Sequence, residues 1–154
     1  MTTPSTIPLS AILLAAGQGT RMKSARPKVL HELCGRPMIH FVVDAALEAG
    51  ASEVIVVVGH GREEVSAYLA KAFGARVKIA VQDQQLGTGH AVRCALPSLS
   101  PEAERVFLLS GDTPLLDAAD LKALAAASAG SASLGMITVK VPDPTGYGRI
   151  LRDD

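Results

Sequence analysis

A cluster of basic side chains follows a glycine-containing turn near the start of this chain of 154 residues. Gly17 and Gly19 come directly after an apolar run, and four cations follow before the first acidic residue, Glu32: Arg21, Lys23, Arg26 and Lys28. Glycine lets backbone N–H groups approach a ligand closely, and clustered cations need an anion. The spacing predicts a phosphate-binding loop, although two glycines alone are equally typical of an ordinary turn between a strand and a helix.

A second polar segment, residues 82–90, combines amides, glycines and a histidine. An amide such as that of Gln82 offers a donor and an acceptor together, which matches the edge of a pyrimidine base. Exposed backbone beside Gly87 and Gly89 can bind the same edge, and His90 is placed to orient the loop. The alternative interpretation is a polar loop in which Thr88 caps a helix.

A third candidate is Asp112, which follows an apolar run and Gly111. A hard cation such as Mg²⁺ prefers one or two carboxylates together with substrate phosphates, so Asp112 is a candidate metal ligand. The alternative is an Asx-type turn. Asp117 and Asp120 suit the cap and the first turn of a helix instead.

Covalent catalysis has no signature in the sequence. The four histidines have no metal-ligand spacing, and no nucleophile motif occurs. The chemistry that these residues favour is therefore positioning and charge neutralisation.

The elements that must position these residues alternate between strand and helix. Apolar runs predict strands at residues 11–16, 54–58, 76–81, 106–109 and 134–141, and helical periodicity predicts helices over 37–50, 62–73, 88–96 and from 117. Residues 147–152 have the pattern of the first half of a β-hairpin. This order predicts an α/β fold of three layers, with a doubly wound, mostly parallel sheet. Ligands of such sheets bind beyond the carboxyl ends of the strands, where all three polar clusters are expected.

Composition excludes several classes of protein. Hydrophobic residues make up 48% of the chain, the formal net charge is zero and only 3% of residues are aromatic. A folded domain is expected, and a nucleic-acid surface is not. Two cysteines, Cys34 and Cys94, are too few for a disulfide framework, and no apolar run is long enough to span a membrane. We therefore expect a cytoplasmic protein.

Five segments together resemble the sugar-1-phosphate nucleotidyltransferases. They are residues 14–22 (LAAGQGTRM), 27–31 (PKVLH), 82 with 85–91 (QLGTGHA), 111–115 (GDTPL) and 143–150 (DPTGYGRI). The resemblance is strongest to the uridyltransferase domains of the bacterial bifunctional UDP-N-acetylglucosamine pyrophosphorylase / glucosamine-1-phosphate N-acetyltransferases. It implies a Rossmann-like nucleotide-diphospho-sugar transferase fold, with residues 1–154 as the N-terminal part of the nucleotidyltransferase domain.

The resemblance also implies a reaction and a set of roles. The reaction is Mg²⁺-dependent uridylyl transfer from UTP to N-acetylglucosamine 1-phosphate, which yields pyrophosphate and a UDP-sugar for peptidoglycan synthesis. Asp112 would bind Mg²⁺, while Arg21 and Lys28 would hold the triphosphate. Gln82, Gly87 and Thr88 would read uracil. The remaining nucleotide and sugar contacts would come from backbone at Leu14, Ala15, Ala16, Gly17, Ser110, Gly111 and Gly148.

Members of the family that the chain resembles continue past the position of Asp154. They carry a sugar-binding Glu and Asn, a second Mg²⁺ ligand, and a left-handed β-helix domain that makes the whole protein a homotrimer. Two alternatives therefore stay open: another sugar-1-phosphate or pyrimidine nucleotidyltransferase, or a nucleotide-binding piece without turnover. A dinucleotide-dependent oxidoreductase is disfavoured, because Met22 stands at the third glycine position of that fingerprint.

Overall fold

A central sheet of four parallel strands organises the computed structural model, which describes residues 8–19, 22–128 and 134–151. The strands lie in the order β5-β4-β1-β6. Their bounds are β1 (Leu9–Ala15), β4 (Glu53–Val58), β5 (Val77–Val81) and β6 (Arg105–Ser110). In chain order β4 and β5 add to one side of β1, and β6 then pairs with the other side, so the direction of winding reverses between β1 and β6.

The two central strands are buried on both faces, as their uninterrupted apolar sequences require. Five consecutive residues of β4, Val54 to Val58, are fully buried, and β1 is buried over most of its length. Parallel strands covered on both sides show this continuous pattern in place of alternation. The register aligns Ala15 with Val58 and Leu14 with Ser110, so the carboxyl ends of the strands meet at one edge.

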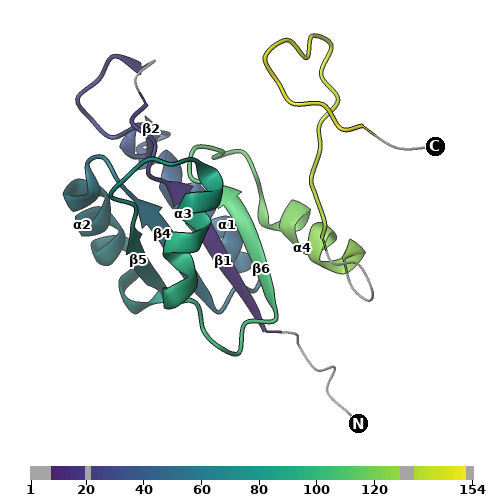
Figure 1. Cartoon of the computed structure of the whole chain (residues 1–154), viewed down its shortest axis with the longest axis horizontal. Coiled ribbons are helices and arrows are strands. Elements are labelled where there is room, and N and C mark those ends of the chain that lie inside the picture. The colour runs from purple at the N-terminus through teal and green to yellow at the C-terminus, as the bar shows by residue number, and fades with distance from the viewer. Residues whose placement is uncertain (1–7, 20–21, 129–133, 152–154) are drawn as a thin grey trace.

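Helices cover both faces of the sheet (Figure 1). On one face α1 (Met38–Glu48), α2 (Arg62–Phe73) and α4 (Ala118–Ala127) pack on the larger apolar core, to which Ile39, Leu69 and Leu121 contribute. On the other face α3 (Thr88–Ala95) packs through Ala91 and Ala95 on Ile12, Ile55 and Val57. The predicted three-layer, doubly wound α/β fold is thus confirmed. No helix in the described part of the chain is long and apolar enough to cross a membrane.

Small elements connect this framework. They are the 3₁₀ helices η2 (Lys28–Leu30), η3 (Gly74–Arg76) and η4 (Leu96–Ser98) and a hairpin of β2 (Glu32–Leu33) with β3 (Arg36–Pro37). The hairpin turns at Cys34 and Gly35, both with positive φ, as a tight two-residue turn requires. Sequence patterns did not indicate this hairpin, because each of its strands is only two residues long.

Two predicted strands are absent. Residues 134–141, and the described part of 147–152, form no strand, and Leu134 and Val139 are 82% and 75% exposed. A strand exists only where a neighbouring backbone takes up its hydrogen bonds. No strand in the described ranges pairs with these segments, so β6 is an edge strand and its Leu108 stays exposed.

The helix predictions were closer to the structure. Residues 62–73 form α2 with the expected bounds, and Asp117 caps α4 by accepting a hydrogen bond from the backbone N–H of Asp120 at 2.9 Å. The expected cap at Thr88 was wrong. Gly87 is the N-cap of α3, and Thr88 is already its first helical residue, so the Thr88 side chain makes no capping bond.

Candidate functional site

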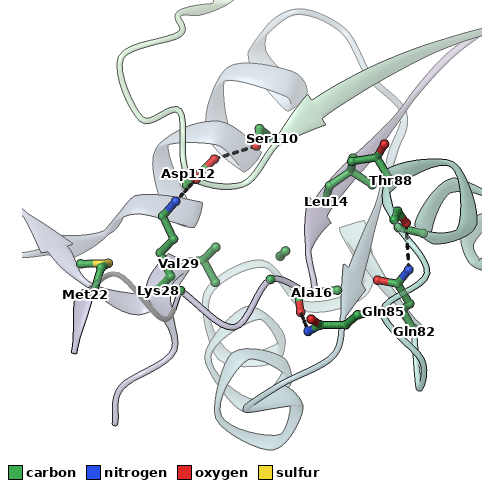
Figure 2. Close-up of a pocket in the computed structure, with 15 residues that line it drawn as sticks. Leu14, Ala16, Met22, Lys28, Val29, Gln82, Gln85, Thr88, Ser110 and Asp112 are labelled. Carbon is green, nitrogen blue, oxygen red and sulfur yellow. Dashed lines mark hydrogen bonds and ion pairs between the residues drawn. The ribbon is translucent and has the colours of Figure 1, made fainter. Parts of the chain in front are cut away.

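A cavity of about 550 Å³ opens at the carboxyl edge of the sheet, where the winding reverses. Its walls come from the segments after β1, β5 and β6 (Figure 2). These segments contain the three polar clusters expected to meet there. The lining residues are Leu14, Ala15, Ala16, Gly17, Gly19, Met22, Lys28, Val29, Gln82, Gln85, Gly87, Thr88, Ala91, Ser110 and Asp112.

Lys28 is held at the cavity wall by its immediate neighbours. It begins η2, whose next two residues, Val29 and Leu30, are buried in the core. Gly19 passes so close that a Cβ there would lie 2.7 Å from the Cβ of Lys28, and its φ of +62° favours glycine as well. The loop therefore needs a glycine at position 19 to place Lys28 where it lies.

The carboxylate of Asp112 binds the ammonium of Lys28 directly. The hydroxyl of Ser110 donates to its second oxygen at 2.6 Å. Partial burial disfavours the charged carboxylate, but the hydrogen bonds from Lys28 and Ser110 and the Lys28 charge outweigh burial, so the pKa of Asp112 lies below its usual value. Asp112 is therefore ionised at neutral pH and faces the cavity.

The other basic residues of the cluster are placed differently. Arg26 bonds to Glu32 at 2.8 Å, so this cation is paired within its own loop. Lys23 is exposed and does not line the cavity. Arg21, the predicted triphosphate ligand, lies outside the described residues. Among the described cations of the cluster, Lys28 alone lines the cavity.

Two glutamine amides form the opposite wall. The Nε2 of Gln85 donates to the carbonyl of Ala16 at 2.7 Å, which ties the segment after β5 to the end of β1. The Nε2 of Gln82 lies 3.1 Å from the carbonyl of Gly87 and 3.0 Å from the Nδ1 of His90. The Gln82 side chain is almost entirely buried. Both amides are thus fixed by neighbours and are not free to rotate with solvent.

The first turn of α3 also faces this wall. Gly87 has φ +94°, a conformation that side chains disfavour, and its carbonyl accepts from the backbone N–H of Ala91 as well as from Gln82. The first N–H groups of a helix have no partner within the helix, and they carry partial positive charge. Donors for an electronegative ligand are therefore available beside Thr88.

Most of the predicted binding residues meet in this cavity. Leu14, Ala15, Ala16, Gly17, Lys28, Gln82, Gly87, Thr88, Ser110 and Asp112 all line it. Gly111 lies directly beside it, with its N–H bonded to the carbonyl of Leu14 at 2.9 Å. Gly148 does not line it; this residue lies exposed in the C-terminal segment, which Figure 1 draws in yellow away from the sheet.

Some contributors were not predicted from the sequence. Val29 and Ala91 supply apolar lining, and Gln85 holds Ala16. Gly59 lets two segments of the wall approach each other, because a Cβ there would lie 3.0 Å from the Ala16 carbonyl and 3.2 Å from that of Gln82. The position of this glycine directly after the strand predicted at residues 54–58 was the sequence signal that two backbone segments pass close together there.

The donor set limits which metal site can form. Within the described residues no group of three or more His, Cys, Asp or Glu side chains could hold a metal ion. A single carboxylate suits Mg²⁺, which keeps several waters and completes its shell with substrate phosphates. The arrangement therefore fits a divalent ion that binds Asp112 together with a phosphate ligand, and it does not fit a closed all-protein site.

Comparisons with known proteins agree with this geometry. The model of the MobA-like NTP transferase domain matches residues 11–151, which is most of the chain. The chain belongs to the MobA-like NTP transferase family. This membership makes it a nucleotidyltransferase by class, and it confirms the resemblance that the sequence motifs indicated.

Individual relatives narrow the likeness further. The NTP transferase chain is 66% identical over 151 residues to the "Bifunctional protein GlmU" of Sorangium cellulosum, a match that covers 95% of this chain and 32% of that protein. The chain thus spans about a third of the length of the curated relatives that it matches.

Solved structures share the fold of the NTP transferase chain. A nucleotidyl transferase from Methanothermobacter thermautotroptrophicus superposes with a TM-score of 0.68 at 28% identity, over 79% of this chain and 58% of that one. Rv0371c of Mycobacterium tuberculosis, determined as a complex with manganese, superposes with a TM-score of 0.62 at 25% identity, over 79% and 59%. Divalent metal is general in this family.

Proposed function

We propose that the chain carries the site for uridylyl transfer from UTP to N-acetylglucosamine 1-phosphate. One observation carries the proposal: Lys28, Asp112 and the Gln82 amide line a single cavity at the carboxyl edge of the sheet. A cation and a metal-ligating carboxylate suit a triphosphate, and a buried amide on the opposite wall suits a base. The volume of about 550 Å³ lies in the range of small-molecule sites, roughly 300–1,000 Å³.

The orientation of the nucleotide follows from these two walls. The base lies against Gln82 and the first turn of α3, and the phosphates extend toward Lys28 and Asp112. The backbone from Leu14 to Gly17 lies between the two walls. The position of Gly17 is open, because a Cβ added there would meet nothing within 4 Å. The ribose can therefore lie against this backbone without obstruction.

The transfer itself needs orientation and charge neutralisation. An oxygen of the sugar phosphate attacks the α-phosphorus of UTP in line, the bond to the β-phosphate oxygen breaks, and pyrophosphate leaves. Lys28 stabilises the negative charge of the transferring phosphoryl group, and Arg21 is assigned to the leaving pyrophosphate. Mg²⁺ held by Asp112 and phosphate oxygens would offset the repulsion between the two reacting phosphates.

The acceptor sugar is proposed from the relatives that share the name GlmU and from residues 143–150. Gly148 is the predicted sugar contact. Because the chain spans about a third of the length of those relatives, the full acceptor site and the homotrimer are proposed for the whole protein, and the assay below tests whether this chain turns over alone.

The test is a pyrophosphate-release assay on the whole protein and on this chain, with Mg²⁺, UTP and N-acetylglucosamine 1-phosphate. We expect pyrophosphate and the UDP-sugar in equal amounts from the whole protein. Parallel reactions with CTP, GTP and other sugar phosphates distinguish the neighbouring nucleotidyltransferase activities. UTP binding by this chain without product would identify it as a nucleotide-binding piece, and absence of product from the whole protein would refute the proposal.

A further inference from the structure

The hydrogen bonds around Gln82 determine which way its amide faces. The carbonyl of Gly87 can only accept, so the Gln82 atom 3.1 Å from it must be the amide nitrogen. That nitrogen also lies 3.0 Å from the Nδ1 of His90. An amide nitrogen only donates, so Nδ1 of His90 accepts, and the proton of a neutral His90 ring sits on Nε2.

The sulfur of Cys94, one helical turn along α3, lies beside the His90 ring, 3.9 Å from Nε2 and 4.0 Å from Nδ1. Because the sulfur is nearly equidistant from the two nitrogens, the tautomer follows from the Gln82 contact alone. With Nδ1 as the acceptor, both hydrogens of the Gln82 amide nitrogen have partners.

In this arrangement the amide oxygen of Gln82 is left without a hydrogen-bond partner among the residues that the structure describes. It makes no hydrogen bond within the described ranges, while its residue is 4% exposed and lines the cavity. In Figure 2 the amide oxygen of Gln82 points toward the side of the cavity where Ala16 lies, away from the dashed hydrogen bond of the amide nitrogen. The wall therefore presents an acceptor, and no donor, from this side chain.

We infer that His90 is a positioning residue that makes Gln82 a hydrogen-bond acceptor and so selects a base carrying N–H at the contacted position. The inference rests on the proposed function. At ring position 3 uracil has an N–H, which pairs with the Gln82 oxygen. Cytosine has a lone pair there, which faces that oxygen without a hydrogen. A site built to accept a hydrogen bond rejects the analogue that lacks it, because buried groups are left unpaired.

His90 acts through Gln82 and contributes by holding its orientation. Gly87 alone fixes one of the two N–H groups, so loss of the His90 acceptor leaves the second one buried and unpartnered. The free-energy preference for the orientation that turns the Gln82 oxygen toward the ligand is then smaller. Selectivity between bases should suffer more than general nucleotide binding, because the phosphate contacts lie on the opposite wall.

The first experiment measures dissociation constants for UTP and CTP with Mg²⁺ on the folded protein. We expect the wild type to prefer UTP by roughly tenfold or more, the value of one hydrogen bond with its desolvation penalty. His90→Leu should reduce that ratio at least threefold. His90→Asn, whose Oδ1 replaces the Nδ1 acceptor, should retain it. His60→Leu, at an exposed histidine outside this cavity, is the matched control and should leave the ratio unchanged.

The outcomes separate the inference from the proposed function. A wild type without preference for UTP refutes both. A clear preference that His90→Leu leaves unaltered, or that His90→Asn loses equally, overturns the role of His90 alone. A second measurement needs no variant: nitrogen-15 NMR of the histidine ring reads the tautomer. An unprotonated Nδ1 with a proton on Nε2 supports the inference, and a proton on Nδ1 of the neutral ring overturns it.

Discussion

Lys28 and Asp112 lie 84 residues apart in the chain, and their side chains form an ion pair at one wall of the cavity. One follows β1 and the other follows β6, the two strands between which the winding reverses. The pair means that the proposed phosphate-binding cation and the proposed metal-ligating carboxylate neutralise each other in the free protein. A metal–nucleotide complex offers each of them a new partner of opposite charge, so binding exchanges one ion pair for two.

Replacing Asp112 by Asn keeps the shape and removes the charge. We expect uridylyl transfer by the whole protein to fall by roughly 10²–10³-fold, the usual cost of losing a charged group at a phosphate. The fold should survive, because a partly exposed ion pair contributes about 1 kcal/mol or less. Steady-state rates and thermal unfolding measure the two effects. Asp120→Asn, on the first turn of α4, is the control; an undiminished rate in Asp112→Asn would remove the metal assignment.

Replacing Lys28 by Met frees the Asp112 carboxylate. The variant without nucleotide should bind Mn²⁺ more tightly than the wild type, by roughly fivefold if the released pair is worth about 1 kcal/mol. UTP should bind more weakly, because a phosphate contact is gone. Electron paramagnetic resonance counts free Mn²⁺ directly. Lys23→Met, at an exposed cation of the same loop, is the control and should change neither the Mn²⁺ affinity nor the UTP affinity. Equal Mn²⁺ affinity in Lys28→Met and wild type would contradict the idea that Lys28 competes with the metal for Asp112.

Gly19→Ala tests how the loop places Lys28. The new Cβ would lie 2.7 Å from the Cβ of Lys28, and the residue would also have to adopt φ +62°. We expect a loss of about 1–3 kcal/mol in the free energy of unfolding, measured by denaturant titration. Gly89→Ala is the matched control, because its Cβ meets nothing within 4 Å in a helix, and it should gain up to about 1 kcal/mol. Equal free energies of unfolding for Gly19→Ala and wild type would show that the loop accommodates a Cβ at position 19 without a cost in stability.

Glu53→Gln tests the opposite edge of the sheet. The Glu53 carboxylate accepts from the Ser100 N–H at 2.7 Å, the Ser10 hydroxyl at 3.1 Å and the Lys78 ammonium at 2.6 Å. Burial opposes its charge, but these bonds outweigh burial and lower its pKa. A lowered pKa stabilises the fold above the unfolded value, near 4.5, and that contribution is lost as pH falls through the folded value.

The variant should therefore be less stable by about 1–3 kcal/mol at pH 7, and the difference should shrink below about pH 4.5. Chemical unfolding at a series of pH values measures it. Glu63→Gln, at an exposed ion pair with Arg62, should show a much smaller change. A difference that stays constant down to pH 2 would show that the charge of Glu53 is not what stabilises the wild type.

Much of the framework follows from local patterns in the sequence. The buried run at residues 54–58 has to be a strand covered on both faces, and α2 begins and ends where its apolar spacing and the glycines at 61 and 74 require. The meeting of the three polar clusters was also predictable, because the carboxyl ends of parallel strands share one edge.

Local patterns misled wherever a distant partner decides the outcome. Residues 134–141 have the apolar run of a strand. A strand also needs backbone hydrogen bonds from a neighbouring strand, and none of the described strands supplies them. Thr88 has the side chain of a cap, yet the turn at Gly87 takes that position and leaves Thr88 on the cavity wall.

The sequence by itself determined the α/β order of elements and the residue types that reach the cavity edge, because periodicity and turn chemistry act over a few neighbouring residues. Only the tertiary structure decided that Lys28 binds Asp112, that Arg26 is taken by Glu32, and that the Gln82 amide faces the cavity with its oxygen. Hydrogen bonds and ion pairs form only when donor and acceptor lie about 3 Å apart, and a change of a few tenths of an ångström weakens them. Those distances follow from packing across the whole core, which no local spacing in the sequence encodes.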